Sequence, residues 1–295
     1  MTTIKNVAVI GGAGNLGPSV VKALLEAGFK VTVLSRASSA STFPSTVRTH
    51  KTDYGSSESL AEAFKGQDAV VSVITTAAAS EQQKIVDAAV KAGVKRFIPS
   101  EYGVNTQHME GGIAKILNGK KATMDLLKKH AAENATFSWT GLSNSMFFDW
   151  GLKVGSLGFS LREKTAIIFD SGNEPFNGTN VGTIGLAIAS ILQHPAKTAN
   201  RYLNIASFTT TQNTLLKILE EETGEEWTVT HLKTDDSFKS AEEKLAKGDY
   251  SAFGDYLKPH LYGDGKGHAN VPLANEELGL PKEDLRETIK MALAQ

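Results

Sequence analysis

A glycine-rich turn near the amino terminus carries the clearest chemical signal in the sequence. Gly11, Gly14 and Gly17 occur at three-residue spacing in Gly-Gly-Ala-Gly-Asn-Leu-Gly, directly after an apolar run that ends at Ile10 and directly before a helical pattern. This spacing allows a sharp turn, leaves bare backbone for a pyrophosphate and directs helix N–H groups at its charge. The turn therefore predicts a dinucleotide site, with a tight turn of no chemical role as the alternative. The predicted contacts are Gly11, Gly12, Gly14, Asn15, Leu16 and Gly17.

The end of the second predicted strand selects between the two nicotinamide cofactors. An acidic residue there would bond a free ribose 2′-hydroxyl and repel a 2′-phosphate, but this strand ends in Ser35 and Arg36. A hydroxyl and a guanidinium suit a 2′-phosphate, so we predict NADP(H) as the cofactor, bound by both residues. An ordinary solvated loop residue is the alternative for Arg36. Thr75 follows the fourth strand, where we expect the cofactor ribose.

Alternating strands and helices must hold these residues in place. In the first half, short β-branched runs alternate with segments of helical period, which is typical of a parallel sheet with helical crossovers. We expect strands at Val7–Ile10, Lys30–Leu34, Val47–Lys51, Ala69–Ile74, Arg96–Pro99 and Thr136–Thr140. We expect helices near Leu16–Ala27, Ser57–Phe64, Ser80–Ala92 and Ala114–Glu133. This order predicts an α/β fold with a doubly wound parallel sheet of the NAD(P)-binding Rossmann type.

The alternation loosens after about Leu142. Further helices are expected near Asn180–Gln193, Thr211–Thr223, Asp235–Lys247 and from Lys282, with a strand near Tyr202–Ile205. We predict a dinucleotide-binding domain over residues 1–145 and a second, smaller α/β substrate lobe over 146–295, with the segment at about 180–205 packing back on the first domain. The loop Tyr262–His268, with three glycines, is predicted to be a flexible surface loop; a lid that reaches the pocket is the alternative.

Composition excludes several classes of function. The 295 residues include 31 Lys plus Arg and 32 Asp plus Glu, so the basic surface that nucleic acid binding needs is not expected. The chain has no cysteine, and its seven histidines show no metal-ligand spacing, so no metal site is predicted. No stretch approaches the ~20 apolar residues of a membrane span, and no basic leader is visible. We expect a cytoplasmic protein without a membrane partner, either monomeric or homodimeric.

Few groups at the expected sheet edge could move a proton. The tyrosine–lysine pair of short-chain dehydrogenases needs four-residue spacing on a helix, and the only match, Tyr262 and Lys266, has two glycines between its members. Lys120 and Lys121, early in the helix before the sixth strand, are the remaining candidates. The pattern alone does not choose between them.

Several motifs together resemble one family. These are the glycine-rich turn, the arginine that ends strand two, the stretch Val94–Gly103, a Lys-Ala pattern at Lys121, and Ser143-Asn144-x-x-Phe147-Phe148. The combination resembles the isoflavone reductase-like, NmrA-like family of atypical short-chain reductases, and its fungal members in particular. Plant members carry a further basic residue beyond the strand-two arginine, whereas residues 37–45 here hold no charge.

The resemblance implies an NADPH-dependent reductase that acts on a small aromatic or conjugated secondary metabolite. The reductases of this family use a helix lysine, and the matching position is Lys121, which would touch the cofactor and assist proton transfer. Asn144 and Phe147 are further cofactor contacts that the resemblance implies. Two alternatives remain: a dinucleotide-sensing regulator without turnover, and an NADP(H)-binding enzyme that catalyses a non-redox step.

An aromatic cluster follows the sixth strand. We predict that Met146, Phe147, Phe148 and Trp150 form an apolar wall for a planar substrate, because such a wall binds rings by burial and ring contacts. Ordinary packing between the two lobes is the alternative. Three later phenylalanines are predicted to be core residues: Phe159, Phe169 and Phe176.

Overall fold

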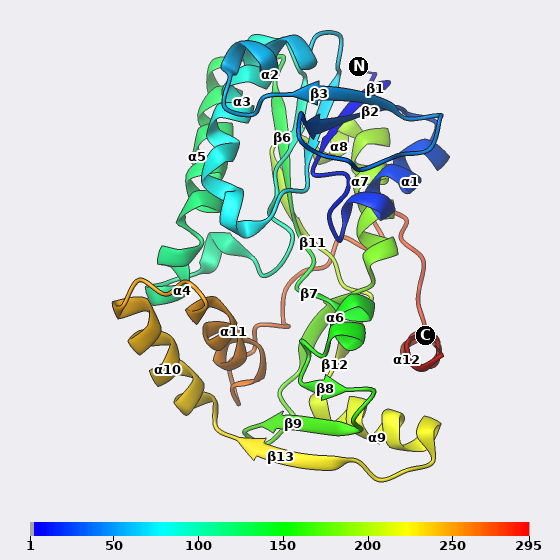
Figure 1. Cartoon of the computed structure of the whole chain (residues 1–295), viewed down its shortest axis with the longest axis vertical. Helices are drawn as coiled ribbons and strands as arrows, with labels where there is room; N and C mark the ends of the chain where they lie inside the picture. Colours follow the sequence, from blue (N-terminus) through cyan, green and yellow to red (C-terminus); the bar gives the residue numbers. More distant parts are fainter. Residues whose placement is uncertain (1–2, 295) are drawn as a thin grey trace.

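Seven parallel strands form the sheet of the upper lobe in the computed structural model, which describes residues 3–294 (Figure 1). Their order across the sheet is β11-β6-β5-β4-β1-β2-β3. The strands are β1 (Asn6–Ile10), β2 (Lys30–Arg36), β3 (Arg48–Thr52), β4 (Ala69–Ser72), β5 (Arg96–Ile98), β6 (Ser138–Ser143) and β11 (Arg201–Asn204). Because all neighbouring strands run parallel, their carboxyl ends meet at one edge, which faces the lower lobe.

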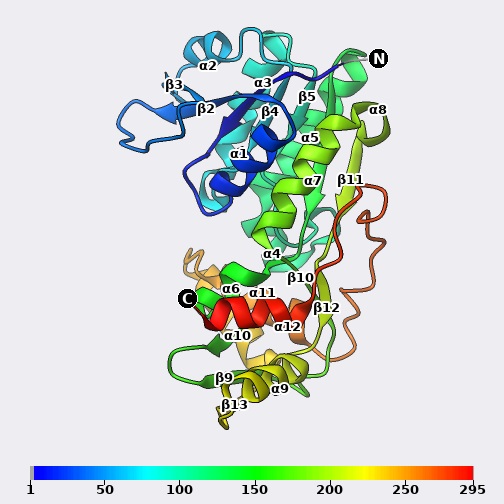
Figure 2. The same ribbon diagram turned by 90° about the vertical axis from the view of Figure 1, so that its right-hand side faces the viewer.

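Helices cover both faces of this sheet (Figures 1 and 2). The central strands β1 and β4 are mostly apolar, and alternate side chains enter two separate cores, as parallel strands require. One face carries α1 (Gly17–Glu26) and α7 (Val181–Gln193), with the short α8 (Pro195–Thr198) after α7. The other face carries α2 (Ser57–Ala63), α3 (Gln82–Lys91) and α5 (Asn118–Glu133). Short helices η1 (Thr76–Glu81), η2 (Thr106–His108) and α4 (Gly111–Ile116) lie in the connections.

The crossing of α1 and α7 depends on a glycine. A Cβ added at Gly185 would lie 2.6 Å from the Ser19 carbonyl oxygen, so the two helices approach with no room for a side chain. Gly185→Ala is therefore expected to lower the free energy of unfolding by about 1–3 kcal/mol, measured by urea denaturation. Gly182→Ala is the matched control, because a Cβ there meets nothing within 4 Å and alanine favours the helix. Equal stability of the two variants would contradict the close crossing.

The lower lobe contains two small sheets and most of the later helices. One sheet joins β7 (Met146–Phe147), β10 (Phe176–Thr179) and β12 (Phe208–Thr210), and the other joins β8 (Phe159–Ser160), β9 (Thr165–Phe169) and β13 (Thr228–Leu232). The helices are α6 (Phe148–Val154), α9 (Gln212–Thr223), α10 (Thr234–Ala246), α11 (Ala252–Tyr262) and α12 (Leu285–Leu293). They enclose a second core rich in aromatic residues. Within residues 3–294, no helix is long and apolar enough to cross a membrane.

The structure contains all six strands predicted in the first half and extends the sheet by one. β11, predicted as a strand near Tyr202–Ile205, pairs with β6 and forms an edge of the upper sheet. The predicted helix Ala114–Glu133 is wrong as a continuous element, because the chain breaks at Leu117 between α4 and α5. The two small sheets, α6 and α11 were not predicted. The domain boundary at residue 145 stays a prediction; it falls between β6 and β7, where the chain first enters the lower lobe.

Candidate functional site

A groove of about 600 Å³ lies over the carboxyl ends of β1, β2 and β4; we call it the β1–β2 groove. Its position outside the sheet edge is where open α/β sheets bind their ligands. The predicted cofactor residues that line it are Gly11, Gly12, Gly14, Ser35, Arg36 and Thr75. Three other residues of the glycine-rich turn do not line it. Leu16 buries its side chain in the upper core, Gly17 starts α1, and Asn15 is exposed.

At two positions of the turn, Gly11 and Gly17, the backbone leaves no room for a side chain. Gly11 has φ +82°, and a Cβ there would lie 2.6 Å from the Val73 carbonyl oxygen. A Cβ at Gly17 would lie 2.2 Å from the Gly12 carbonyl oxygen. The backbone therefore folds back on itself immediately before α1 and presents the helix amino terminus at the groove, which is an arrangement that binds anions.

A second basic residue lies beside the end of β2. Lys51 on β3 is in register with Ser35, and its Nζ donates a hydrogen bond to the Ser35 hydroxyl (3.4 Å) and to the Ser39 carbonyl oxygen. Together with the exposed Arg36, it gives this end of the groove two cations. Lys51 was not predicted, because a second basic residue was expected just beyond Arg36, within residues 37–45. The parallel pairing of β2 with β3 is the signal that would have found it.

Lys120, and not Lys121, turns toward the sheet edge. Lys120 is only 3% exposed, and its Nζ donates a hydrogen bond to the Tyr102 carbonyl oxygen (3.3 Å), just after β5. A Cβ at Gly119 would lie 2.9 Å from the Ser80 amide nitrogen, so α5 packs directly on η1 with its rotation fixed. This rotation leaves Lys121 exposed, without a hydrogen-bond or ion-pair partner among residues 3–294. Lys120 is therefore the lysine that faces the sheet edge, and the predicted role of Lys121 stays a prediction.

A buried carboxylate accompanies Lys120. Glu101 is fully buried and accepts hydrogen bonds from the hydroxyls of Thr106 and Tyr202, the latter at 2.9 Å. Burial raises the pKa of Glu101, while the nearby Lys120 ammonium opposes that rise. Conversely, burial lowers the pKa of Lys120 and Glu101 opposes that change. The pair thus holds an ammonium that gives up a proton more readily than a solvated lysine does.

Asn144 lies buried at the end of β6. Its side chain is fully buried, and its Oδ1 accepts a hydrogen bond from the Gly103 amide (3.0 Å). Its carbonyl oxygen also accepts a hydrogen bond from the Thr179 hydroxyl (2.7 Å). Asn144 therefore ties the loop after β5 to the end of β6, and its predicted contact with the cofactor stays a prediction.

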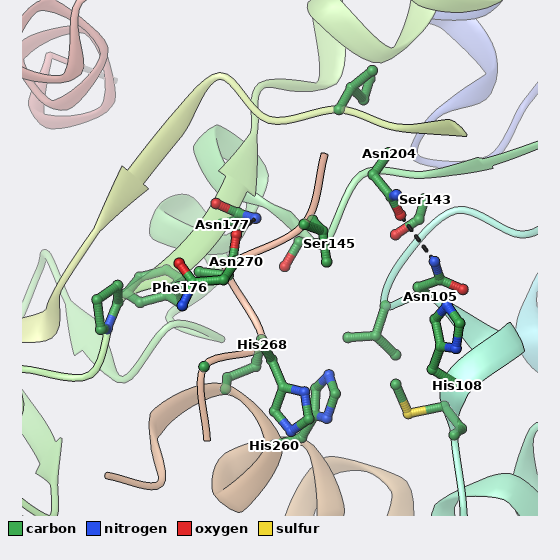
Figure 3. Close-up of a pocket in the computed structure, with 18 residues that line it drawn as sticks. Asn105, His108, Ser143, Ser145, Phe176, Asn177, Asn204, His260, His268 and Asn270 are labelled. Atoms are coloured by element: carbon green, nitrogen blue, oxygen red, sulfur yellow. Dashed lines mark hydrogen bonds between the residues drawn. The ribbon is translucent and has the colours of Figure 1, made fainter. Parts of the chain in front are cut away.

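A second cavity, of about 260 Å³, lies at the far end of the same sheet edge, beyond β6 and β11 (Figure 3). We call it the β6–β11 cavity. Its walls combine the end of both strands, the loop after β5, residues of α11 and the loop that follows α11. The polar side chains that line it are Asn105, His108, Ser143, Ser145, Asn177, Asn204, His260, His268 and Asn270. Among the described residues, no Asp, Glu, Lys or Arg lines it.

Strand order places Lys120 between the two openings. The β1–β2 groove covers the ends of β1 and β2, the β6–β11 cavity covers β6 and β11, and β4 and β5 lie between them. Lys120 contacts Tyr102, and two residues later Val104 lines the β6–β11 cavity. The edge therefore presents the glycine-rich turn at one end and a neutral polar cavity at the other, and Lys120 is buried between them and lines neither space.

The predicted aromatic wall does not line either space. Phe148 is fully buried and packs against Phe208 in the lower core, with ring centroids 5.0 Å apart, so its predicted contact with a substrate is wrong. Phe147 and Trp150 pack edge to face at 6.3 Å against the upper core, and Met146 packs against the lower one. All three are half-buried, and their ligand contacts stay predictions.

Residues that were predicted to lie elsewhere form the cavity wall instead. Phe159, Phe169 and Phe176 are buried, which confirms them as core residues, but Phe176 also lines the β6–β11 cavity. His268 lies on the cavity wall, yet residues 264–266 and His268 are exposed, so the predicted surface position of the loop is confirmed. No spacing signal joins Phe176, His260 and His268, because they come from three separate elements. Residues 3–294 contain no group of three or more potential ligands that could hold a metal ion.

Comparison with known proteins identifies the family of the chain. The NmrA-like family profile matches residues 3–256. The chain belongs to the NmrA-like family. This NmrA-like protein is similar to the oxidoreductase aprR of Aspergillus flavus, with 40% identity over 252 residues that cover 83% of each chain. It is also similar to the oxidoreductase poxI of Penicillium oxalicum, with 31% identity over 288 residues, covering 95% of this chain and 91% of the relative.

Solved structures confirm the fold predicted for this NmrA-like protein. A structure described as AtPrR2 with NADP+ and (+)pinoresinol has a TM-score of 0.82 at 22% identity, covering 98% of this chain and 99% of the other. An isoflavone reductase has a TM-score of 0.79 at 20% identity, with the same coverage. The Rossmann-type sheet and the resemblance to the isoflavone reductase-like, NmrA-like family are therefore both confirmed.

Proposed function

We propose that this NmrA-like protein is an NADPH-dependent reductase of a small aromatic or conjugated secondary metabolite. The observation that carries the proposal is the buried Lys120 between the β1–β2 groove and the β6–β11 cavity. Relatives named oxidoreductases support the reaction class. The structural neighbour described with NADP+ and pinoresinol supports the cofactor and an aromatic substrate.

The β1–β2 groove suits NADP(H) along its length. The turn from Gly11 to Gly17 would hold the pyrophosphate, and Arg36 and Lys51 would hold the 2′-phosphate. A dinucleotide held in this way extends along the edge toward β4 and β5, past Thr75 and toward Lys120. When bound, NADPH supplies the hydride.

Lys120 is the residue to which we assign proton transfer, in place of Lys121. Reduction of a conjugated system places negative charge on the substrate, and an adjacent ammonium stabilises that charge and donates a proton to it. The nearby Glu101 carboxylate stabilises the charge of the ammonium, and Thr106 and Tyr202 hold the carboxylate. Glu101 is therefore a positioning residue, and Lys120 the proton donor.

Product analysis with deuterated NADPH tests the proposal. Candidate substrates are pinoresinol, an isoflavone and a leucoanthocyanidin, the compound classes named for the structural neighbours. We expect NADPH to be consumed only when a substrate is present, with the label transferred to the product. A product without label would favour the non-redox alternative. Tight NADPH binding without consumption across a broad panel of aromatic compounds would favour the sensor.

The two cations at the end of β2 give a cofactor prediction. Arg36→Ala and Lys51→Ala are each expected to weaken NADPH binding about tenfold and to leave NADH binding unchanged, because each removes a charge-assisted bond to the 2′-phosphate. Titration of NADPH fluorescence measures both dissociation constants. Lys30→Ala, at the exposed opposite end of β2, is the control. An equal loss of affinity for NADH and NADPH would show that neither residue binds the 2′-phosphate.

A further inference from the structure

The β6–β11 cavity contains polar side chains whose hydrogen-bonding groups are unused. Asn105 and Asn177 are occupied, since Asn105 donates to Asn204 (3.0 Å) and Asn177 donates to the Ala269 carbonyl oxygen (3.0 Å). By contrast, His260 and His268 have no hydrogen-bond partner among residues 3–294. Unpaired donors and acceptors at the wall of a pocket are the groups that orient a bound ligand.

The two histidines form one unit. Their rings stack with centroids 3.9 Å apart and an interplanar angle of 27°. Figure 3 shows the pair at one side of the cavity, with Ser145 and Asn177 at other points of the wall. Stacking fixes both ring planes, so the ring nitrogens have defined directions instead of rotating freely.

The loop that carries His268 is anchored. Glu174 accepts hydrogen bonds from the amides of Gly265 (2.8 Å) and Gly267 (2.7 Å). Asn177 holds the Ala269 carbonyl oxygen on the other side of His268. The imidazole is thus positioned from both sides, which a site that recognises one ligand atom requires.

The pair is uncharged near neutral pH. Burial and the neighbouring His268 lower the pKa of His260 to about 4. Burial and Lys266 lower the pKa of His268, while Glu174 opposes that change. A neutral imidazole offers one N–H donor and one acceptor, which matches a hydroxyl or carbonyl oxygen and gives a carboxylate no counter-charge.

We propose that His260 and His268 are specificity-determining residues that hydrogen-bond to an oxygen substituent of an uncharged ring substrate in the β6–β11 cavity. This inference rests on the proposed function, because it takes the cavity as the substrate site. The two imidazoles then decide which position of the substrate ring must carry oxygen, since a ring without that substituent leaves their nitrogens without this hydrogen bond.

Three probes of similar shape test the inference: 2-naphthol, 2-methylnaphthalene and naphthalene-2-carboxylate. Their dissociation constants are measured by NMR titration of the NADP+-loaded protein. We expect 2-naphthol to bind about tenfold more tightly than 2-methylnaphthalene, and the carboxylate to bind most weakly. His260→Phe and His268→Phe are expected to remove the preference for the hydroxyl and to leave the affinity for 2-methylnaphthalene unchanged.

Two controls keep the result interpretable. His231→Phe changes an exposed histidine on β13 and is expected to alter no probe. His260→Asn retains a hydrogen-bonding group and is expected to keep part of the preference if the phenylalanine variants do not fold. NADPH affinity and turnover, measured on the same samples, report on the proposed function separately.

Three outcomes would overturn the inference. These are a hydroxyl preference that survives in all three pocket variants, a carboxylate that binds as tightly as 2-naphthol, and a failure of every probe to bind. If the wild-type protein still reduces a substrate in any of these cases, the proposed function stands and the assignment of the histidines alone is lost.

Discussion

Lys120→Met is expected to lower kcat about 10²–10⁴-fold on the best substrate of the panel, with NADPH binding retained. Methionine keeps the length and the burial of the side chain but removes the ammonium that donates the proton. The loss appears in kcat because the ammonium interacts most strongly with charge that develops in the transition state. The variant protein stays folded if Glu101 takes up a proton, a change that its raised pKa already favours. Steady-state kinetics and NADPH titration measure the two effects separately.

Lys121→Met is the matched control for that experiment. Lys121 is the next residue on α5, has the same chemistry and is exposed, so its removal is expected to change kcat less than twofold. If Lys121→Met lost activity while Lys120→Met kept it, Lys121 would be the proton donor. The inward-facing position of Lys120 on α5 would then have no role in the reaction.

Gly17→Ala is expected to weaken NADPH binding by at least about 100-fold and to lower the melting temperature. The new Cβ would lie 2.2 Å from the Gly12 carbonyl oxygen and 2.7 Å from that of Gly11, and both are backbone atoms that cannot rotate away. The start of α1 must therefore move from the turn, which removes the aligned N–H groups that bind a pyrophosphate. Thermal unfolding and fluorescence titration measure the two losses.

Gly14→Ala separates the two roles of glycine in the same turn. A Cβ there approaches only the Gly11 carbonyl oxygen, at 3.3 Å, but Gly14 lines the β1–β2 groove. We expect weaker NADPH binding with a much smaller loss of stability. If both variants kept wild-type affinity for NADPH, the pyrophosphate would bind elsewhere.

Local sequence signals were sufficient for the first half of the fold. The strands around Val7–Ile10 and Lys30–Leu34 are buried on both faces, so their apolar runs stand out without knowledge of their partners. The glycines of the turn are required by contacts within a few residues or with the adjacent strand. The same locality explains why Arg36 could be placed at the end of β2 from the sequence.

Residues that depend on packing between distant segments could not be placed in this way. Lys120 is an exception, because its spacing from Met124 and Leu127 places it on the buried face of a helix, and the packing of α5 on η1, α3 and β6 confirms that face. Lys51 belongs to the site through strand register. The cavity wall brings together His260 of α11 and His268 of the following loop, and the small sheets of the lower lobe carry short strands that periodicity does not detect.

The late arrival of β11 in the sequence has a consequence for biosynthesis. β11 completes the edge of the upper sheet, and α7 covers the same face as α1, yet both follow β7 to β10 of the lower lobe. A nascent chain that has just released β6 therefore leaves the side of α1 that α7 covers, at Ser19 and Ala23, without its partner helix until Gln193 has left the ribosome. The upper sheet thus closes only after β7 to β10 of the lower lobe have been made, and a chaperone that shields α1 would act during that interval.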